Sequence, residues 1–109
     1  IVGALEHMGI RGEYKPINDV LVNGRKISGS AQKRFRGSIL QHGTLIVADD
    51  RETMESVLIP LKKRSATTSL EEILGSIPRR EDIVEALKAG FSSFNGTLEE
   101  RPQSTFFLL

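Results

Sequence analysis

The chain has 109 residues, of which 39% are hydrophobic and 27% charged, and its formal net charge is +1. This length and composition are typical of one small globular domain, which we expect to span residues 1–109. Because the net charge is so low, binding to an anionic partner would need a local cluster of cations. The sequence contains no cysteine, which excludes disulfides, a thiolate nucleophile and sulfur-ligated metals within these residues. No apolar run approaches the ~20 residues of a membrane span.

The first half of the chain predicts a short helix followed by an antiparallel meander. Residues 2–8 carry apolar side chains at helical spacing, and Gly9 ends that helix. Residues 19–22 form a β-branched run, and the Asn23-Gly24 pair after it is a strong hairpin signal, because a type I′ turn needs two positive φ angles. The remaining predicted elements are a strand over residues 25–35, a turn around Gly37 and a strand over residues 39–48.

The second half predicts helices. In the last and clearest one, Ile83, Leu87 and Phe91 recur at helical spacing on a face that we expect in the core. Thr68 or Ser69 caps the helix before it. Strands followed by helices predict an α+β fold, in which an antiparallel meander sheet is packed by helices. The three predicted helices span residues 49–59, 68–75 and 78–96. Residues 104–109 form either a last strand or a frayed end.

Residues 24–45 combine cations with very small side chains, a pattern that suits an anionic ligand. A glycine inside a strand often marks the close approach of a ligand or of another backbone. With strand alternation, Lys26, Ser28, Ser30 and Gln32 would share one face and form a polar track suited to a phosphate or carboxylate. The five cations of the segment are Arg25, Lys26, Lys33, Arg34 and Arg36.

Simpler interpretations of this segment stay open. The cations also fit a solvated hairpin face that discourages edge pairing. His42, in an otherwise apolar strand, is either a hydrogen-bonded core residue or a functional one. A nucleic-acid-binding module is a weaker alternative, because Phe35 is the one aromatic residue among the cations and offers no stacking platform. We therefore expect no nucleic-acid partner and no membrane association.

The run from residue 18 to residue 47 resembles the central segment of the lipoate–protein ligase and octanoyltransferase family, which shares its catalytic fold with biotin protein ligases. The family pattern is Asn-Asp before a strand, then Gly-(Arg/Lys)-Lys-(Ile/Val)-(Ser/Ala)-Gly-Ser-Ala, a basic stretch, and (Leu/His)-(Gln/His)-His-Gly-(Thr/Ser)-(Leu/Ile). Residues 67–75 and 80–96 also resemble the segments that family members carry after this pattern. The matching positions are Asn18, Asp19, Gly24, Lys26, residues 28–32 and residues 41–45.

This resemblance implies ATP-dependent lipoate–protein ligation. Lipoate and ATP give an acyl-adenylate, and the amine of a lysine on a lipoyl domain or a glycine-cleavage H-type protein then displaces AMP. Lys26 is implied as the catalytic residue that contacts the acyl carbonyl and the α-phosphate. Asp19 is implied as a Mg²⁺ ligand. The implied substrate- and nucleotide-binding residues are Asn18, Asp19, Ser28, Gly29, Ser30, Ala31, Gln32, His42, Gly43 and Thr44.

The chain departs from the family in two respects. The Arg-Arg and Gly-Gly signature of the phosphate-binding loop is absent, so we expect the C-terminal portion of a catalytic domain and a partner: a complementary N-terminal half that carries the Gly-rich loop, in a cytoplasmic heterodimer. The octanoyltransferase branches use a cysteine thioester, and the missing cysteine favours the ligase unless the partner supplies the thiol. A lipoyl or octanoyl transferase and a non-catalytic carrier-binding half remain alternatives. We also expect Lys33, Arg34 and Arg36 to steer an acidic lipoyl domain.

Overall fold

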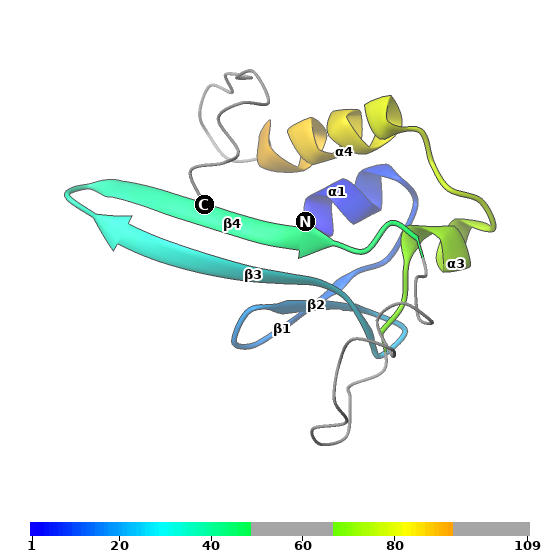
Figure 1. The fold of residues 1–109 in the computed structure, drawn as a ribbon, viewed down its shortest axis with the longest axis horizontal. Coiled ribbons are helices and arrows are strands. Elements are labelled where there is room, and N and C mark those ends of the chain that lie inside the picture. Colours follow the sequence, from blue (N-terminus) through cyan, green and yellow to red (C-terminus); the bar gives the residue numbers. More distant parts are fainter. Residues whose placement is uncertain (49–66, 93–109) are drawn as a thin grey trace.

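The computed structural model describes residues 1–48 and 67–92, which form a four-stranded antiparallel sheet accompanied by helices (Figure 1). The strands follow one another in the order β1-β2-β3-β4, and α1 and α4 lie together on one side of the sheet. The α+β class expected from the sequence is confirmed. The elements are α1 (Val2–His7), β1 (Glu13–Lys15), β2 (Asp19–Val22), β3 (Arg25–Phe35), β4 (Ser38–Leu45), α3 (Leu70–Leu74) and α4 (Arg80–Ser92).

Two tight hairpins connect the long strands, as the turn residues predict. Asn23 and Gly24 have φ angles of 51° and 75°, which is the pair of positive values that a type I′ turn requires. Arg36 and Gly37 repeat the arrangement between β3 and β4, with φ angles of 44° and 77°. Both turns match the right-handed twist of the strands and so set the register of the sheet.

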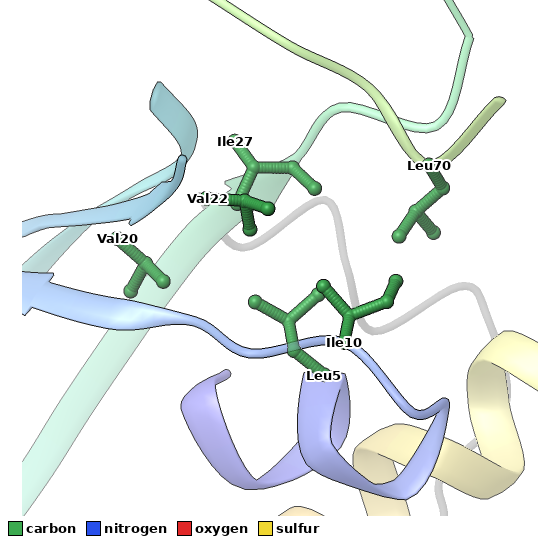
Figure 2. Packing of buried hydrophobic residues seen from close by; sticks show 6 residues of the cluster. All are labelled: Leu5, Ile10, Val20, Val22, Ile27 and Leu70. Carbon is green, nitrogen blue, oxygen red and sulfur yellow. The ribbon is translucent and has the colours of Figure 1, made fainter. Parts of the chain in front are cut away.

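The core lies between the sheet, α1 and the start of α3. Figure 2 shows six apolar side chains converging there from these elements and from the loop that follows α1. Leu5 of α1 and Ile27 of β3 are completely buried, so truncating either to alanine would cost about 2–5 kcal/mol of folding free energy. The six residues are Leu5, Ile10, Val20, Val22, Ile27 and Leu70.

A β-bulge at Ile27 changes which residues of β3 share a face. Val20 of β2 is paired with Ser28, but the next residue, Leu21, is paired with Lys26, so Ile27 is the extra residue. The sequence-based prediction that Lys26 and Ser28 share one face assumed uninterrupted alternation along β3. It is therefore wrong. Ser28 is 1% exposed and belongs to the core side, whereas Lys26 belongs to the opposite face.

Helix α4 packs through small residues rather than large ones. Its buried residues are Ala86 and Gly90, and a Cβ added to Gly90 would lie 2.6 Å from the backbone nitrogen of Ala4 in α1. Ile83 packs against the core as expected, but Phe91 is 46% exposed, so its predicted core position is wrong. The buried face of α4 carries Ala86 and Gly90, and Phe91 lies about 100° around the helix from Gly90.

The short helix α3 begins and ends as predicted. The Ser69 side chain accepts a hydrogen bond from the Glu72 backbone N–H at 3.1 Å, and Gly75 closes the helix in the left-handed conformation. Within the described residues, no helix is long and apolar enough to cross a membrane. The predicted helix over residues 49–59, the end of the last helix beyond residue 92 and the segment 104–109 lie outside the described residues.

Candidate functional site

Lys26 and Asp19 form an ion pair on the sheet face opposite α1. The Lys26 Nζ lies 2.8 Å from the Asp19 Oδ1, and the two side chains are 33% and 22% exposed. They approach because the bulge pairs Lys26 with Leu21, two residues from Asp19 on the same face of β2. An ammonium has three N–H donors, so a lysine that donates one to Asp19 can still bind an anionic ligand.

Gly29 provides the space that the Lys26 side chain occupies. Gly29 is paired with Asp19, and a Cβ at this position would lie 3.1 Å from both the Cε and the Nζ of Lys26. The sequence pattern predicts that a ligand or another backbone comes close to this glycine. In the structure, the group that comes close is the Lys26 side chain itself.

The register divides the predicted site residues between the two faces of the sheet. Gly29 is opposite Thr44, and Ala31 is opposite His42, so these four residues share the face of Lys26 and Asp19. His42 is exposed, which rules out the core interpretation of this histidine. The predicted site residues on the other face are Ser28, Ser30, Gln32 and Gly43.

Asn18 holds the approach to β2 against β3. Its side-chain Nδ2 donates to the backbone oxygen of Ser30 at 2.7 Å, and its own backbone oxygen accepts from the Ser30 N–H at 2.9 Å. These bonds fix the backbone next to Asp19. In the Asn-Asp pair, Asn18 therefore links the two strands by hydrogen bonds, and Asp19 pairs with Lys26.

A second set of polar contacts anchors the backbone of Lys26 and was not predicted from the sequence. The Thr68 N–H donates to the Lys26 backbone oxygen at 2.8 Å, and the Arg25 guanidinium binds both the backbone oxygen of Thr67 and the carboxylate of Glu72. Glu72 also accepts from the Thr68 hydroxyl at 3.1 Å. Arg25 and Glu72 are 47 positions apart, so no local spacing could have linked them.

Asp19 is the carboxylate that lies beside Lys26, and carboxylate oxygens are ligands that Mg²⁺ prefers. Among residues 1–48 and 67–92, no group of three or more His, Asp or Glu side chains is arranged to hold a metal. A nucleotide-bound Mg²⁺ needs only one or two protein carboxylates, because phosphates and water fill its other positions. Asp19 binds Lys26 through Oδ1, and a carboxylate has a second oxygen that can bind a cation. The residues present therefore fit such an ion.

The fold and the motif together can be compared with known families. The family model described as the lipoyl protein ligase A/B catalytic domain matches residues 1–92. The chain belongs to this family. The region of this chain that matches the lipoyl protein ligase A/B model includes the whole sheet and both helices that lie on it. It therefore includes every site residue described above.

Relatives in the family have different activities. The lipoate-protein ligase LplJ of Bacillus subtilis is 29% identical over 85 residues, covering 78% of this chain and 26% of LplJ. The octanoyltransferase LipM of Kyrpidia tusciae is 36% identical over 97 residues, covering 80% of this chain and 35% of LipM. The chain therefore spans about a third or less of the length of these two relatives.

A solved structure shows the same fold. The bipartite lipoate protein ligase of Thermoplasma acidophilum, from a study of an archaeal lipoylation system that includes its E2 lipoyl domain, superposes with a TM-score of 0.73 at 20% identity. The match covers 98% of this chain and 47% of that chain. The fold of this chain is thus a portion of the lipoate ligase catalytic fold.

Proposed function

We propose that this chain is the C-terminal portion of the catalytic domain of an ATP-dependent lipoate–protein ligase. The observation that carries the proposal is the Lys26–Asp19 ion pair, which is 2.8 Å long and lies on a sheet face beside Gly29 and Thr44. The similarity to a lipoate-protein ligase of Bacillus subtilis supports the same activity. A complementary N-terminal portion would supply the Gly-rich loop, as the short coverage of the relatives suggests.

The proposed reaction has two steps. In the first, a lipoate carboxylate oxygen attacks the α-phosphorus of ATP, the bond to the β,γ-phosphates breaks, and lipoyl-AMP and pyrophosphate form. In the second, the amine of an acceptor lysine attacks the acyl carbonyl, an amide bond forms, and AMP leaves with the electron pair of the acyl–oxygen bond while the amine loses a proton. The acceptor is a lipoyl domain or a glycine-cleavage H-type protein.

Lys26 would act in both steps by the same physical effect. Negative charge builds up on the α-phosphate oxygens in the first step and on the acyl oxygen in the second, and a fixed ammonium next to these atoms stabilises both transition states. Asp19 would hold the ammonium in place through Oδ1 and would be this chain's ligand for Mg²⁺, which offsets phosphate charge when bound. His42 and Thr44, on the same face, would line the site.

An octanoyltransferase is the second candidate, because LipM is 36% identical to this chain. An enzyme of that kind would transfer the acyl group from an acyl carrier without ATP. No cysteine is present in these 109 residues, so a thioester route would need a thiol from the complementary portion. The two candidates therefore differ in their need for ATP.

The test is pyrophosphate release from ATP by the chain assembled with its complementary portion. With lipoate and Mg²⁺ present, we expect release by the wild type and a rate lower by about 10²–10³ in Lys26→Ala. Because the Lys26 side chain is partly exposed, this variant should keep the thermal midpoint of the wild type. Full activity of Lys26→Ala would remove Lys26 from the mechanism, and acyl transfer from an acyl carrier without ATP would assign the transferase activity instead.

A further inference from the structure

The outer half of the β3–β4 hairpin is a second candidate surface, and we name its residues 31–43 the hairpin arm. Figure 1 shows the arm extending past α1 and α4, away from the core. Every residue of the arm is exposed. Because the arm contributes nothing to the described core, its sequence is free to serve another molecule.

The arm carries positive charge without local compensation. Lys33, Arg34 and Arg36 lie within it, and no acidic residue occurs in residues 31–48. At the inner end of the same strand, Arg25 and Lys26 are instead paired with carboxylates. Unlike the cations of the site, the cations of the arm are therefore placed to interact with an acidic partner.

The arm also exposes large apolar side chains beside its cations. Phe35, Ile39 and Leu40 are 62%, 58% and 57% exposed, and the Arg36 guanidinium lies 5.1 Å from the centre of the Phe35 ring. An edge that only has to stay soluble and unpaired needs cations but not these apolar groups. Arginine and aromatic side chains together are typical of protein-binding surfaces.

The arm is continuous with the Lys26 site. Lys33, Phe35 and Leu40 share the sheet face of Gly29 and Thr44, with Ala31 and His42 between the two regions. Lys33 is seven positions from Lys26, or roughly 20 Å along an extended strand. The arm therefore lies where a protein that inserts a lysine side chain at the Lys26 site could contact it.

We propose that the hairpin arm docks the acceptor protein through an acidic surface beside the target lysine. This inference rests on the proposed function and adds the partner-binding surface to it. Two observations favour the acceptor as the occupant: the arm has cations with no acidic residue in residues 31–48, and it lies on the sheet face of the Lys26 site, which the target lysine has to reach. Charge attraction of this kind acts mainly on the rate of association and weakens as salt rises.

The test uses the chain assembled with its complementary portion and an unmodified lipoyl domain as the probe. The variant Lys33→Glu/Arg34→Glu reverses two charges on the arm. The control Arg11→Glu/Lys88→Glu makes the same change in net charge with exposed residues outside the arm. The measurements are the association rate with the lipoyl domain at several salt concentrations, the KM for the lipoyl domain, and pyrophosphate release without it.

We expect the arm variant to lower the association rate and raise the KM by about tenfold at low salt, with a difference that shrinks as salt rises. Its pyrophosphate release and its assembly with the complementary portion should match those of the control. An unchanged association rate with the lipoyl domain would overturn the docking role. Failure of the arm variant to assemble with the complementary portion would also overturn it, because that result would assign the arm to the interface with this portion. The absence of pyrophosphate release from the wild type would instead refute the ligase function, while the association rate would still test the docking.

Discussion

Lys26 reaches Asp19 because β3 contains one extra residue. The bulge at Ile27 lets Ile27 and Ser28 both enter the core side, although they are consecutive, and turns Lys26 to the opposite face. The Asp19 carboxylate then binds the ammonium. Gly29, which has no side chain, leaves room for the end of the lysine. Bulges are frequent next to active sites because they re-aim single side chains in this way.

Gly29→Ala tests whether the position of the Lys26 ammonium matters for activity. The new methyl group would lie 3.1 Å from both the Cε and the Nζ of Lys26, so the flexible end of the lysine must shift by a few tenths of an ångström. We expect the rate of adenylate formation to fall by about tenfold or more, because small displacements of a catalytic group are costly, with little change in thermal midpoint. Ser38→Ala, an exposed change of similar size in β4, is the control.

An unchanged rate in Gly29→Ala would show that the enzyme tolerates a displaced ammonium, which would weaken the proposed role of Lys26. A large drop in thermal midpoint would show instead that the glycine is needed for folding.

The sequence motif indicated candidate residues but did not reveal which face of the sheet each of them occupies. The motif indicated Lys26, Asp19 and Gly29, which the structure brings together. It also indicated Ser28, which the structure buries on the other face, because a bulge leaves no clear signal in the alternation of polar and apolar residues. The contacts of Arg25 with residues 67 and 72 depend on tertiary packing and could not be predicted from local spacing.

At the scale of elements, the two helices on the sheet pack as closely as their backbones allow. A Cβ on Gly3 would lie 3.1 Å from the Cα of Gly90, and one on Gly90 would lie 2.6 Å from the backbone nitrogen of Ala4. Backbone atoms cannot move aside as a flexible side chain can. The crossing of α1 and α4 therefore depends on glycine at both positions.

Gly90→Ala should destabilise the protein, although alanine is the better helix former. In an exposed helix, this change would stabilise by about 0.8–1.0 kcal/mol. Here the methyl group must push α1 and α4 apart, and overpacking of this kind costs about 1–3 kcal/mol, so we expect a net loss in the free energy of unfolding. Chemical denaturation measures it, with Glu85→Ala on the exposed face of α4 as the control. A more stable Gly90→Ala protein would contradict the observed crossing.

Element prediction succeeded where local chemistry decides the structure. The turns at Asn23 and Arg36 and the cap at Ser69 depend on a few adjacent residues and were found. The strand β1 was missed because all three of its residues are exposed, so it has no alternation of buried and exposed positions. The core position predicted for Phe91 is wrong because apolar spacing does not reveal that the small residues Ala86 and Gly90 form the buried face of α4.

At the scale of the whole molecule, the proposed function assigns the described residues to one side of a site. The sheet face of Lys26 is opposite the one that packs on α1, and the chain spans 26% of LplJ and 35% of LipM. The proposal assigns the other side of the site to a complementary portion of the catalytic domain. The hairpin arm extends the same face outward toward the proposed acceptor.

The most direct test of this account is a crystal structure of the assembled enzyme with a non-hydrolysable acyl-adenylate analogue. We predict that the analogue lies on the face of Gly29 and Thr44, with the Lys26 Nζ about 3 Å from an oxygen of its acyl or phosphate group. An analogue bound on the opposite face, beside Ser30 and Gln32, or a Lys26 ammonium out of hydrogen-bonding reach of the analogue, would contradict the account.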